Sequence, residues 1–250
     1  MRSAVLLLCC VGLFAAFIQP NTPAPLDTRL YEMRVYYSPE GKQPDLMARF
    51  RNHTMRIFEK HGMTNVGYFV PQHKPDSCLI YFLSYPNRAA RDSSWKAFGS
   101  DPEWKKVSSE SEKNGRIVSK VISKFFHTTD FSPQLQIDQK GNRVFQLRTY
   151  KTTSYNLPLL LARFRNHTTK LFEKHGMTNL VYWTEDNTDN ILMYLLTQKS
   201  KEAGEAAFKA FREDPEWVSV RTASEKLANG SLTESVTSVY LVPTDFSPLK

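Results

Sequence analysis

Cysteine is scarce in this chain, which has three among its 250 residues. Cys9 and Cys10 lie in an apolar segment at the N-terminus, so only Cys78 is left for a folded domain. One thiol cannot form an internal disulfide. The sequence also lacks the HExxH and CxxC patterns of metal sites, the P-loop, the nucleophile elbow and the glycine fingerprint of dinucleotide-binding proteins. The enzyme classes that these motifs identify are therefore not indicated, and we predict no metal site.

Long runs of one charge are also missing. The chain carries 33 Lys and Arg against 25 Asp and Glu, a formal net charge of +8, but no block of five or more like charges occurs. Clustered basic residues are the usual signature of nucleic-acid binding, whereas scattered charges mainly serve solubility. We therefore expect no nucleic-acid partner.

The N-terminus holds the one extended apolar run, from Ala4 to Ile18, which follows Arg2 and precedes Pro20 and Pro23. This run is shorter than the roughly 20 residues that a membrane-spanning helix needs. A basic start, a short apolar run and a proline-rich exit are typical of a secretory signal peptide. We predict that residues 1–26 are such a segment and that the protein is exported, to the periplasm or outside the cell. No clean cleavage motif is present, so a retained membrane anchor is the alternative, and a membrane is a partner only in that case.

One long segment occurs twice. Residues 48–65 read ARFRNHTMRIFEKHGMTN and residues 162–179 read ARFRNHTTKLFEKHGMTN, an offset of 114. Further pairs follow at offsets of 113 to 115: Asp-Pro-Glu-Trp at 101–104 and 214–217, and Asp-Phe-Ser-Pro at 130–133 and 245–248. The offset rises by two at Leu227-Ala228, where we expect a loop or a helix end.

A period near 114 residues is too long for a solenoid unit and indicates a duplicated domain. We predict a first repeat over residues 29–133, a polar linker over 134–142 and a second repeat over 143–249.

Hydrophobic periodicity predicts the elements of one repeat. Apolar and polar residues alternate over 30–37, which is typical of a strand, and a helical stripe over 44–61 ends at Gly62. The remaining predictions are strands over 66–70, 78–85 and 117–126, a helix over 88–98, and a further helix start at Asp101-Pro-Glu-Trp. The order β-α-β-β-α-β is ferredoxin-like and gives an α+β fold. Helices cover one face of such a sheet, so the other faces of the two repeats can cover each other.

Several short segments together point to a known family. They are Tyr31-Glu-Met-Arg-Val-Tyr-Tyr, Glu59-Lys-His-Gly-Met, Gly67-Tyr, both Asp-Pro-Glu-Trp segments and the ending Val242-Pro-Thr-Asp-Phe-Ser-Pro-Leu-Lys. On these residues the chain resembles the NIPSNAP family of dimeric α/β-barrel proteins, over about residues 29–249. The resemblance implies two tandem ferredoxin-like repeats whose sheets form one intramolecular dimeric α/β barrel.

The resemblance implies little about chemistry, although related barrels include haem-degrading and quinol monooxygenases. Family members of animal cells are linked to mitochondria and vesicle traffic. The N-terminus here is not an amphipathic, Arg-rich presequence, so exported bacterial members are the nearer comparison.

The first strand of each repeat supplies candidate ligand-binding residues. If Met33 and Val35 pack under the helices, the polar side chains of this strand face the barrel interior. These are Glu32, Arg34 and Tyr36 in the first repeat and Gln146, Arg148 and Tyr150 in the second. A buried arginine needs a partner. Glu32 can serve Arg34, but Gln146 cannot neutralise Arg148, so we predict an anion or carboxylate ligand there; solvated or otherwise paired arginines are the alternative.

Two pairs of histidines also recur. His61 and His175 end their helices just before glycine, where they could act as a ligand or acid-base group at the barrel mouth, or bond the last helical carbonyls. His53 and His167 lie at the edge of the apolar stripe, within reach of a metal or haem. Because His53 and His61 are about 12 Å apart along the helix, they could not readily share one metal.

Two classes of function remain open. The first is non-catalytic binding of a small ligand or a protein partner, which we favour, with no cofactor expected. The second is a monooxygenase-like enzyme that acts inside the barrel, either with haem or without a cofactor. A homo-oligomer is compatible with both. Arg51, Asn52 and Glu59 recur although they point outward, which duplication or a shared partner surface would explain.

Overall fold

The structure is a computed structural model that describes residues 26–141 and 143–250. The predicted signal segment therefore lies, apart from Leu26, outside the described residues. Within the described part, no helix is long and apolar enough to span a bilayer.

Each repeat contributes four strands and the helices that cover them. The first repeat consists of β1 (Leu30–Tyr37), α1 (Gln43–Arg49), η1 (Phe50–Thr54), α2 (Met55–Lys60), β2 (Thr64–Pro71), β3 (Cys78–Tyr85), α3 (Arg88–Ser100), α4 (Pro102–Ser111) and β4 (Lys120–Thr128). The second consists of β5 (Val144–Thr152), α5 (Leu157–Arg163), η2 (Phe164–Thr168), α6 (Thr169–Lys174), β6 (Thr178–Glu185), β7 (Ile191–Gln198), α7 (Lys201–Glu213), α8 (Pro215–Leu227) and β8 (Thr233–Pro243).

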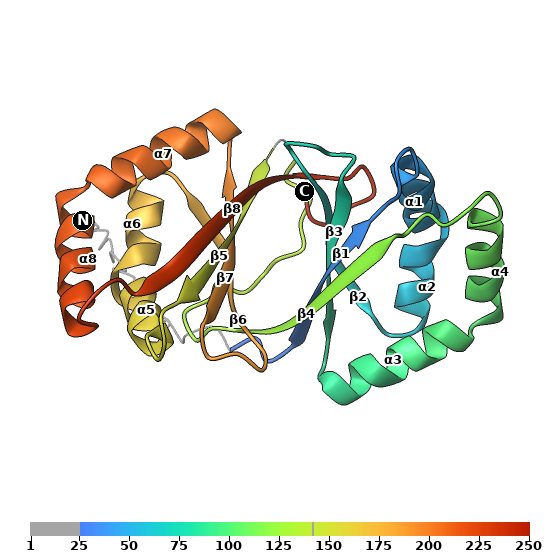
Figure 1. The fold of residues 1–250 in the computed structure, drawn as a ribbon, viewed down its shortest axis with the longest axis horizontal. Coiled ribbons are helices and arrows are strands. Elements are labelled where there is room, and N and C mark those ends of the chain that lie inside the picture. The colour runs from blue at the N-terminus through green and yellow to red at the C-terminus, as the bar shows by residue number, and fades with distance from the viewer. Residues whose placement is uncertain (1–25, 142) are drawn as a thin grey trace, which may run out of the picture.

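The eight strands form one closed barrel in the order β1-β3-β2-β8-β5-β7-β6-β4. Within the first repeat the strand order 4-1-3-2 is ferredoxin-like, and the second repeat reproduces it. The two sheets meet where β2 pairs with β8 and β4 pairs with β6. Figure 1 shows β4 and β8 crossing the central barrel, with the helices of the two repeats on opposite sides of it. The predicted fold, an α+β chain of two tandem ferredoxin-like repeats that make an intramolecular barrel, is confirmed.

The helix predicted over 44–61 contains a π-helical turn in its middle. The turn covers Phe50–Thr54, and the same turn recurs at Phe164–Thr168. In each repeat a threonine hydroxyl, on Thr54 or Thr168, donates to the carbonyl five residues earlier at 3.2 Å. Such turns insert an extra residue into a helix and are frequent at functional sites. Here the turn carries the recurring Asn-His pair outward while Phe50 and Phe164 stay in the core.

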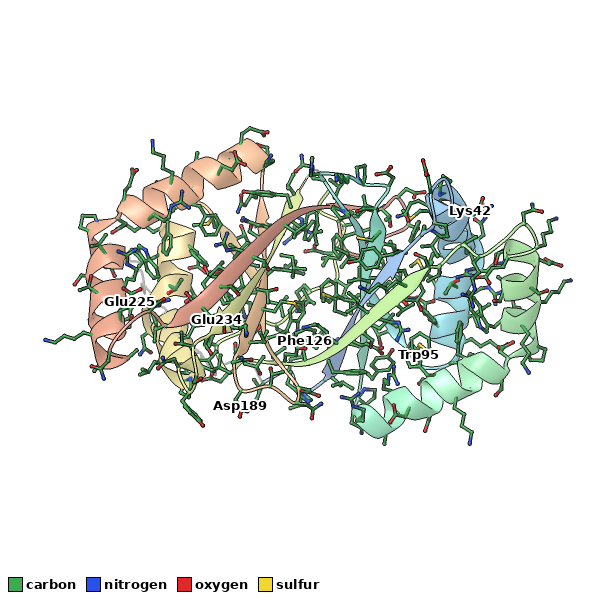
Figure 2. The ribbon with its side chains drawn as sticks, in the orientation of Figure 1. Lys42, Trp95, Phe126, Asp189, Glu225 and Glu234 are labelled. Carbon is green, nitrogen blue, oxygen red and sulfur yellow. The ribbon has the colours of Figure 1, made fainter. Side chains whose placement is uncertain are left out.

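Apolar side chains fill the barrel interior. Trp183 stacks on Phe82, with ring centroids 5.3 Å apart, and is surrounded by side chains from both repeats. Figure 2 labels Phe126 in this central region. The interior cluster includes Tyr31, Met33, Val35, Phe69, Phe126, Phe145, Leu147, Trp183, Met193 and Leu195. The interior of the barrel is therefore an apolar core to which both repeats contribute.

The predicted orientation of β1 was wrong. Met33 and Val35 face the barrel interior, whereas Glu32 and Arg34 face the layer of helices. The reason is that both faces of this strand are covered, one by the opposite sheet and one by helices. Alternation shows that the two faces differ, but it does not show which one meets the larger apolar core. The candidate residues Glu32, Arg34, Tyr36, Gln146, Arg148 and Tyr150 therefore lie between sheet and helices, outside the barrel interior.

The Asp-Phe-Ser-Pro segments join the two repeats. Asp130, at the end of the first repeat, accepts two hydrogen bonds from Arg165 at 2.6 and 2.7 Å, and Asp245 accepts two from Arg51 at 2.7 Å. The following rings also cross over, Phe131 onto Tyr182 and Phe246 onto Tyr68. The recurrence of Arg51 is thus explained by contact between the repeats. The recurring Glu59 is explained as well, since it accepts a hydrogen bond from Asn65 at 2.9 Å.

Candidate functional site

In the first repeat, the space between β1 and α3 is closed by a buried carboxylate. Glu32 is fully buried, and it accepts hydrogen bonds from residues of four elements. The donors are Arg34 (2.6 Å), Ser123 (2.7 Å), Arg91 (2.9 and 3.0 Å), Tyr85 (3.0 Å) and Trp95 (3.1 Å). Trp95 is labelled in Figure 2. Burial alone would raise the pKa of Glu32, but the bond from Arg91 and the charge of Arg34 lower it to about 2. The ionised Glu32 therefore has two arginine partners, and both of its oxygens accept hydrogen bonds from within the first repeat.

The same place in the second repeat has no carboxylate. Gln146 stands in the position of Glu32, and Gly204 and Phe208 stand in the positions of Arg91 and Trp95. Gln146 is 2% exposed and donates to Ser238 at 2.8 Å. Its carbonyl oxygen accepts from Gln198 at 2.8 Å. The amide is satisfied by neutral partners and supplies no negative charge.

Arg148, the counterpart of Arg34, is left without a counter-ion. Its guanidinium donates to the hydroxyls of Tyr194 at 3.1 Å and Tyr150 at 3.3 Å, and it lies 4.2 Å from the centre of the Phe208 ring. No ion pair within 26–141 and 143–250 includes it. Burial lowers the pKa of Arg148, but Tyr194 and Tyr150 raise it above its ordinary value, so the group stays charged. A charge that is largely removed from water and unpaired is costly, so this position favours an anion from outside.

A cleft opens beside Arg148. Its inner part is a cavity of about 240 Å³ lined by Gln146, Arg148, Glu205, Phe208, Arg212, Ser238 and Tyr240. It continues past Glu205, Ser238 and Tyr240 into an outer hollow of about 640 Å³, whose rim includes Lys201 and the first-repeat residue His73. We call the two parts together the Arg148 cleft. It lies between α7 and the strands β5 and β8, and it is open to solvent.

The corresponding entrance in the first repeat is shut by ion pairs. Arg88 lies 3.5 Å from the centre of the Phe125 ring and donates to Asp186 of the opposite repeat at 3.3 Å. Lys124 pairs with Glu185 at 2.9 Å beside it. In the second repeat Lys201 takes the place of Arg88, and its partner is Glu205 on its own helix, at 3.6 Å. Among the residues that the structure describes, no ion pair therefore crosses the entrance to the Arg148 cleft.

Gly204 is part of what keeps the cleft different from its counterpart. A Cβ atom at this position would lie 1.4 Å from the Gln198 side-chain oxygen and 2.8 Å from the Tyr240 hydroxyl. The side chain of Gln198 thus occupies the space where Arg91 enters the first-repeat cluster. At this equivalent position, the first repeat places the Arg91 side chain and the second repeat places the Gln198 side chain.

The remaining predicted site residues do not join this cleft. His61 and His175 contact Asp101 and Asp214 at 2.6 and 2.7 Å, and these aspartates cap α4 and α8. Lys60 and then His61 lower the pKa of Asp101. These histidines therefore join helices to one another, rather than bonding the last carbonyls of their own helix.

His53 and His167 are exposed on η1 and η2, where each lines a groove toward α4 or α8. The structure does not bring them near His61 or His175. Within the residues described, no three His, Cys, Asp or Glu side chains are placed to hold a metal ion.

Five residues that line the inner cleft were not predicted from the sequence, and neither was Gly204 on the adjoining helix; the five are Glu205, Phe208, Arg212, Ser238 and Tyr240. A signal for Gly204 and Phe208 was available, because aligning 88–100 with 201–213 replaces Arg91 by Gly204 and Trp95 by Phe208. Both changes remove donors from the position of the Glu32 carboxylate. The sequence alone does not show that α7 covers β5, so it does not show that these substitutions lie beside Gln146.

Comparison with known proteins adds the following. The family model described as NIPSNAP matches residues 31–133 and again 145–248. No protein with a curated description matches the chain. A proposed monooxygenase from Lactobacillus acidophilus has 13% identity and a TM-score of 0.55, covering 87% of this chain and 94% of its own.

A second proposed monooxygenase, from Fusobacterium nucleatum, has 12% identity and a TM-score of 0.58, covering 86% and 92%. A NIPSNAP family protein of unknown function from Agrobacterium tumefaciens has 20% identity and a TM-score of 0.38, covering 42% of this chain and 93% of its own. At these identities, the likeness to the two proposed monooxygenases shows a shared fold only.

Proposed function

The chain belongs to the NIPSNAP family, and we propose that its second repeat binds a small organic anion, a carboxylate in the simplest case, in the Arg148 cleft. The observation that carries the proposal is the difference between two equivalent arginines. Arg34 has the Glu32 carboxylate at 2.6 Å, whereas Arg148 has only tyrosine hydroxyls. A ligand carboxylate at Arg148 would take the role that Glu32 has in the first repeat.

The walls of the cleft suit such a ligand. Arg148 supplies a charged donor at the inner end, and the hydroxyls of Ser238 and Tyr240 lie along one wall. The ring of Phe208 offers an apolar surface opposite, and Arg212 adds a second positive charge. The lining is mostly polar, with one carboxylate, Glu205, beside the two arginines, so hydrogen bonds and charge would fix the ligand more than apolar contact.

We favour binding over catalysis. The alternative of a monooxygenase-like reaction inside the barrel meets a packed apolar interior, with Trp183 and Phe82 stacked near its centre. The proposal therefore places recognition outside the barrel, under α7. A protein partner that presents a carboxylate side chain to the cleft is the second candidate, supported by the same charge.

The test is a panel of small carboxylates, including acetate, benzoate, succinate and citrate, measured by thermal unfolding and then by calorimetric titration. A ligand that binds only the folded state raises the melting temperature. We expect at least one carboxylate to do so for the wild type, and Gln146→Glu to abolish the effect by giving Arg148 an internal counter-ion. Glu32→Gln is the matched control, because it makes the converse change in the other repeat and leaves the cleft intact.

Two results would reject the proposal. One is a carboxylate that stabilises Gln146→Glu and Arg148→Gln as much as the wild type, since it then binds elsewhere. The other is a wild type that none of the carboxylates stabilises, when the protein is pure and folded.

We also propose that the protein is exported, on the basis of the basic start and the apolar run from Ala4 to Ile18. The intact mass of the protein purified from its own host tests this. Loss of a segment that ends near residue 26 would support export with cleavage. A full-length mass in the cytosolic fraction would contradict it.

A further inference from the structure

A second arginine of the second repeat is also buried without a carboxylate. Arg163, the last residue of α5, is 7% exposed. It donates to the Ser224 hydroxyl at 3.2 Å and lies 5.0 Å from the centre of the Trp217 ring; its Nε atom, like that of the equivalent Arg49, has no partner among the described residues. None of the ion pairs in the described part of the chain includes it. Burial lowers the pKa of Arg163 from its ordinary value.

The equivalent arginine of the first repeat is neutralised. Arg49 donates to Glu112 at 3.1 Å and to Ser111 at 3.2 Å. Glu225 corresponds to Glu112 in sequence, but it lies 3.8 Å from Arg221 on its own helix. Figure 2 labels Glu225 on α8. The second repeat has kept the arginine and the glutamate and has separated them.

The separation has a cause in the length of the helix. The first repeat reads Ser-Glu-Lys-Asn-Gly over 111–115, and the second reads Ser-Glu-Lys-Leu-Ala-Asn-Gly over 224–230. In the first repeat α4 ends at Ser111, and Glu112 is its C-terminal cap, free to turn toward Arg49. The two extra residues let α8 continue to Leu227. Glu225 therefore stays on the helical surface, where its neighbour at i−4 is Arg221.

A groove of about 330 Å³ lies over Arg163, between α5, η2 and α8. Its walls are mainly apolar, unlike those of the corresponding groove in the first repeat. Leu159 and Ala223 line it where the first repeat has Asp45 and Glu110. The full lining consists of Leu159, Ala162, Arg163, Asn166, His167, Ser219, Val220, Ala223, Ser224 and Leu227. We call this the Arg163 groove; it shares no lining residue with the Arg148 cleft.

We propose that the Arg163 groove is a second ligand site, which takes an amphiphile with one carboxylate head and a short apolar chain. The carboxylate accepts hydrogen bonds from Arg163, with Asn166 and His167 beside it. The chain lies along Leu159, Val220 and Ala223. This assigns a role to Asn166 and His167 of η2, which are exposed and line the groove.

The experiment is a calorimetric titration with octanoate, and with octanol as the neutral probe of the same chain length. We expect octanoate to bind at one site and octanol to bind about tenfold more weakly or worse, because it lacks the charged bond to Arg163. Ser224→Asp gives Arg163 a carboxylate within the protein and is expected to weaken octanoate binding by about tenfold or more. Ser111→Asp is the matched control in the first repeat and is expected to leave octanoate binding as it is.

Two further variants keep the result interpretable. Leu159→Asp copies the first-repeat residue onto the half-exposed wall of the groove, so it tests the apolar contact at a side chain that also packs against the second-repeat core. Circular dichroism shows whether each variant is folded. Equal binding of octanoate by the wild type and by folded Ser224→Asp and Leu159→Asp would overturn the proposal. Loss of octanoate binding in Gln146→Glu alone would also overturn the proposal, because the octanoate would then occupy the Arg148 cleft. Absence of octanoate binding by the wild type would overturn it too.

Discussion

Each repeat has two largely buried arginines at equivalent positions, and the partners of these arginines differ in a consistent way between the repeats. Arg34 and Arg49 of the first repeat each have a carboxylate within 3.1 Å. Arg148 and Arg163 of the second have only neutral partners, hydroxyl groups and aromatic rings. Since the two repeats have the same fold, the surroundings of an arginine in one repeat can be compared directly with those of its counterpart in the other. This difference is the basis of our proposal that the second repeat accepts negative charge from outside.

At the level of single residues, Glu32→Gln is expected to destabilise the protein by about 3 kcal/mol, because it leaves buried arginines with no counter-ion. Equilibrium unfolding in guanidinium chloride measures the change. Gln146→Ala is the comparison, since it removes neutral hydrogen bonds only and is expected to cost about 1–2 kcal/mol. Equal losses in the two variants would contradict the assignment of Glu32 as the charged centre of the first repeat.

The same carboxylate predicts a dependence of stability on pH. The pKa of Glu32 is lowered from 4.5 to about 2 in the folded protein. A lowered carboxylate pKa stabilises the folded state above the unfolded pKa, and this contribution is lost as the pH falls through the folded pKa. A shift of this size corresponds to about 3 kcal/mol. The free energy of unfolding of the wild type should therefore fall between about pH 4.5 and 2.

Glu32→Gln is the control for this pH dependence. Asp101 and Asp214 also have lowered pKa values and contribute in acid, in the variant as in the wild type. The difference between wild type and variant should therefore shrink toward pH 2. A difference that stays constant from pH 6 to pH 2 would show that folding does not shift the pKa of Glu32, and a difference that grows toward pH 2 would show that folding raises it.

At the level of elements, the sequence was most informative where its pattern is local. The strands over 30–37 and 78–85 were predicted with the bounds that the structure shows, and Asp101 was predicted to start a helix, which it caps. The π-helical turn within 44–61 could not be predicted, because one inserted residue leaves the apolar stripe nearly unchanged. Hydrophobic periodicity predicts whether a segment is a helix or a strand, but it does not reveal a single residue inserted within a helix.

The sequence singled out Gln146 and Arg148 but placed them in the barrel interior, and the anion ligand stays a prediction. The sequence shows that Gln146 cannot neutralise Arg148, and that difference holds in the structure. It does not show which face of β5 meets the helices, because both faces are buried. Nor does it show that two added residues after Lys226 would move Glu225 away from Arg163, since that depends on where α8 ends.

Helix length offers a prediction at this scale. Deletion of Leu227 and Ala228 restores the spacing of the first repeat, so α8 should end earlier and Glu225 should reach Arg163. We expect octanoate binding to weaken by about tenfold, with the protein at least as stable as the wild type. Calorimetric titration and guanidinium unfolding measure the two effects. A deletion variant that is folded and binds octanoate as before would show that the spacing does not control the groove.

At the level of the whole molecule, the two repeats depend on each other. Strand pairs β2–β8 and β4–β6 close the barrel, and the Arg51–Asp245 and Arg165–Asp130 pairs hold each end segment on the other repeat. The apolar cluster inside the barrel also draws on both repeats. A single repeat would expose this cluster and two strand edges to water.

A fragment of residues 26–133 is therefore expected to form a homodimer rather than a folded monomer. Two copies can pair β2 with β4 of each other, in place of the junctions that the second repeat supplies. Light scattering coupled to size-exclusion chromatography gives the mass, and circular dichroism shows whether the fragment is folded. A monomeric, cooperatively folded fragment would contradict the dependence of the repeats on each other.

The central claim is that the second repeat holds an anion which the first repeat replaces with its own Glu32. Native mass spectrometry of the protein purified from its own host tests it most directly, with wild type, Gln146→Glu and Glu32→Gln compared side by side. We predict a bound small molecule on the wild type and on Glu32→Gln, and none on Gln146→Glu. The same bound mass on all three proteins, or none on any of them, would contradict the claim.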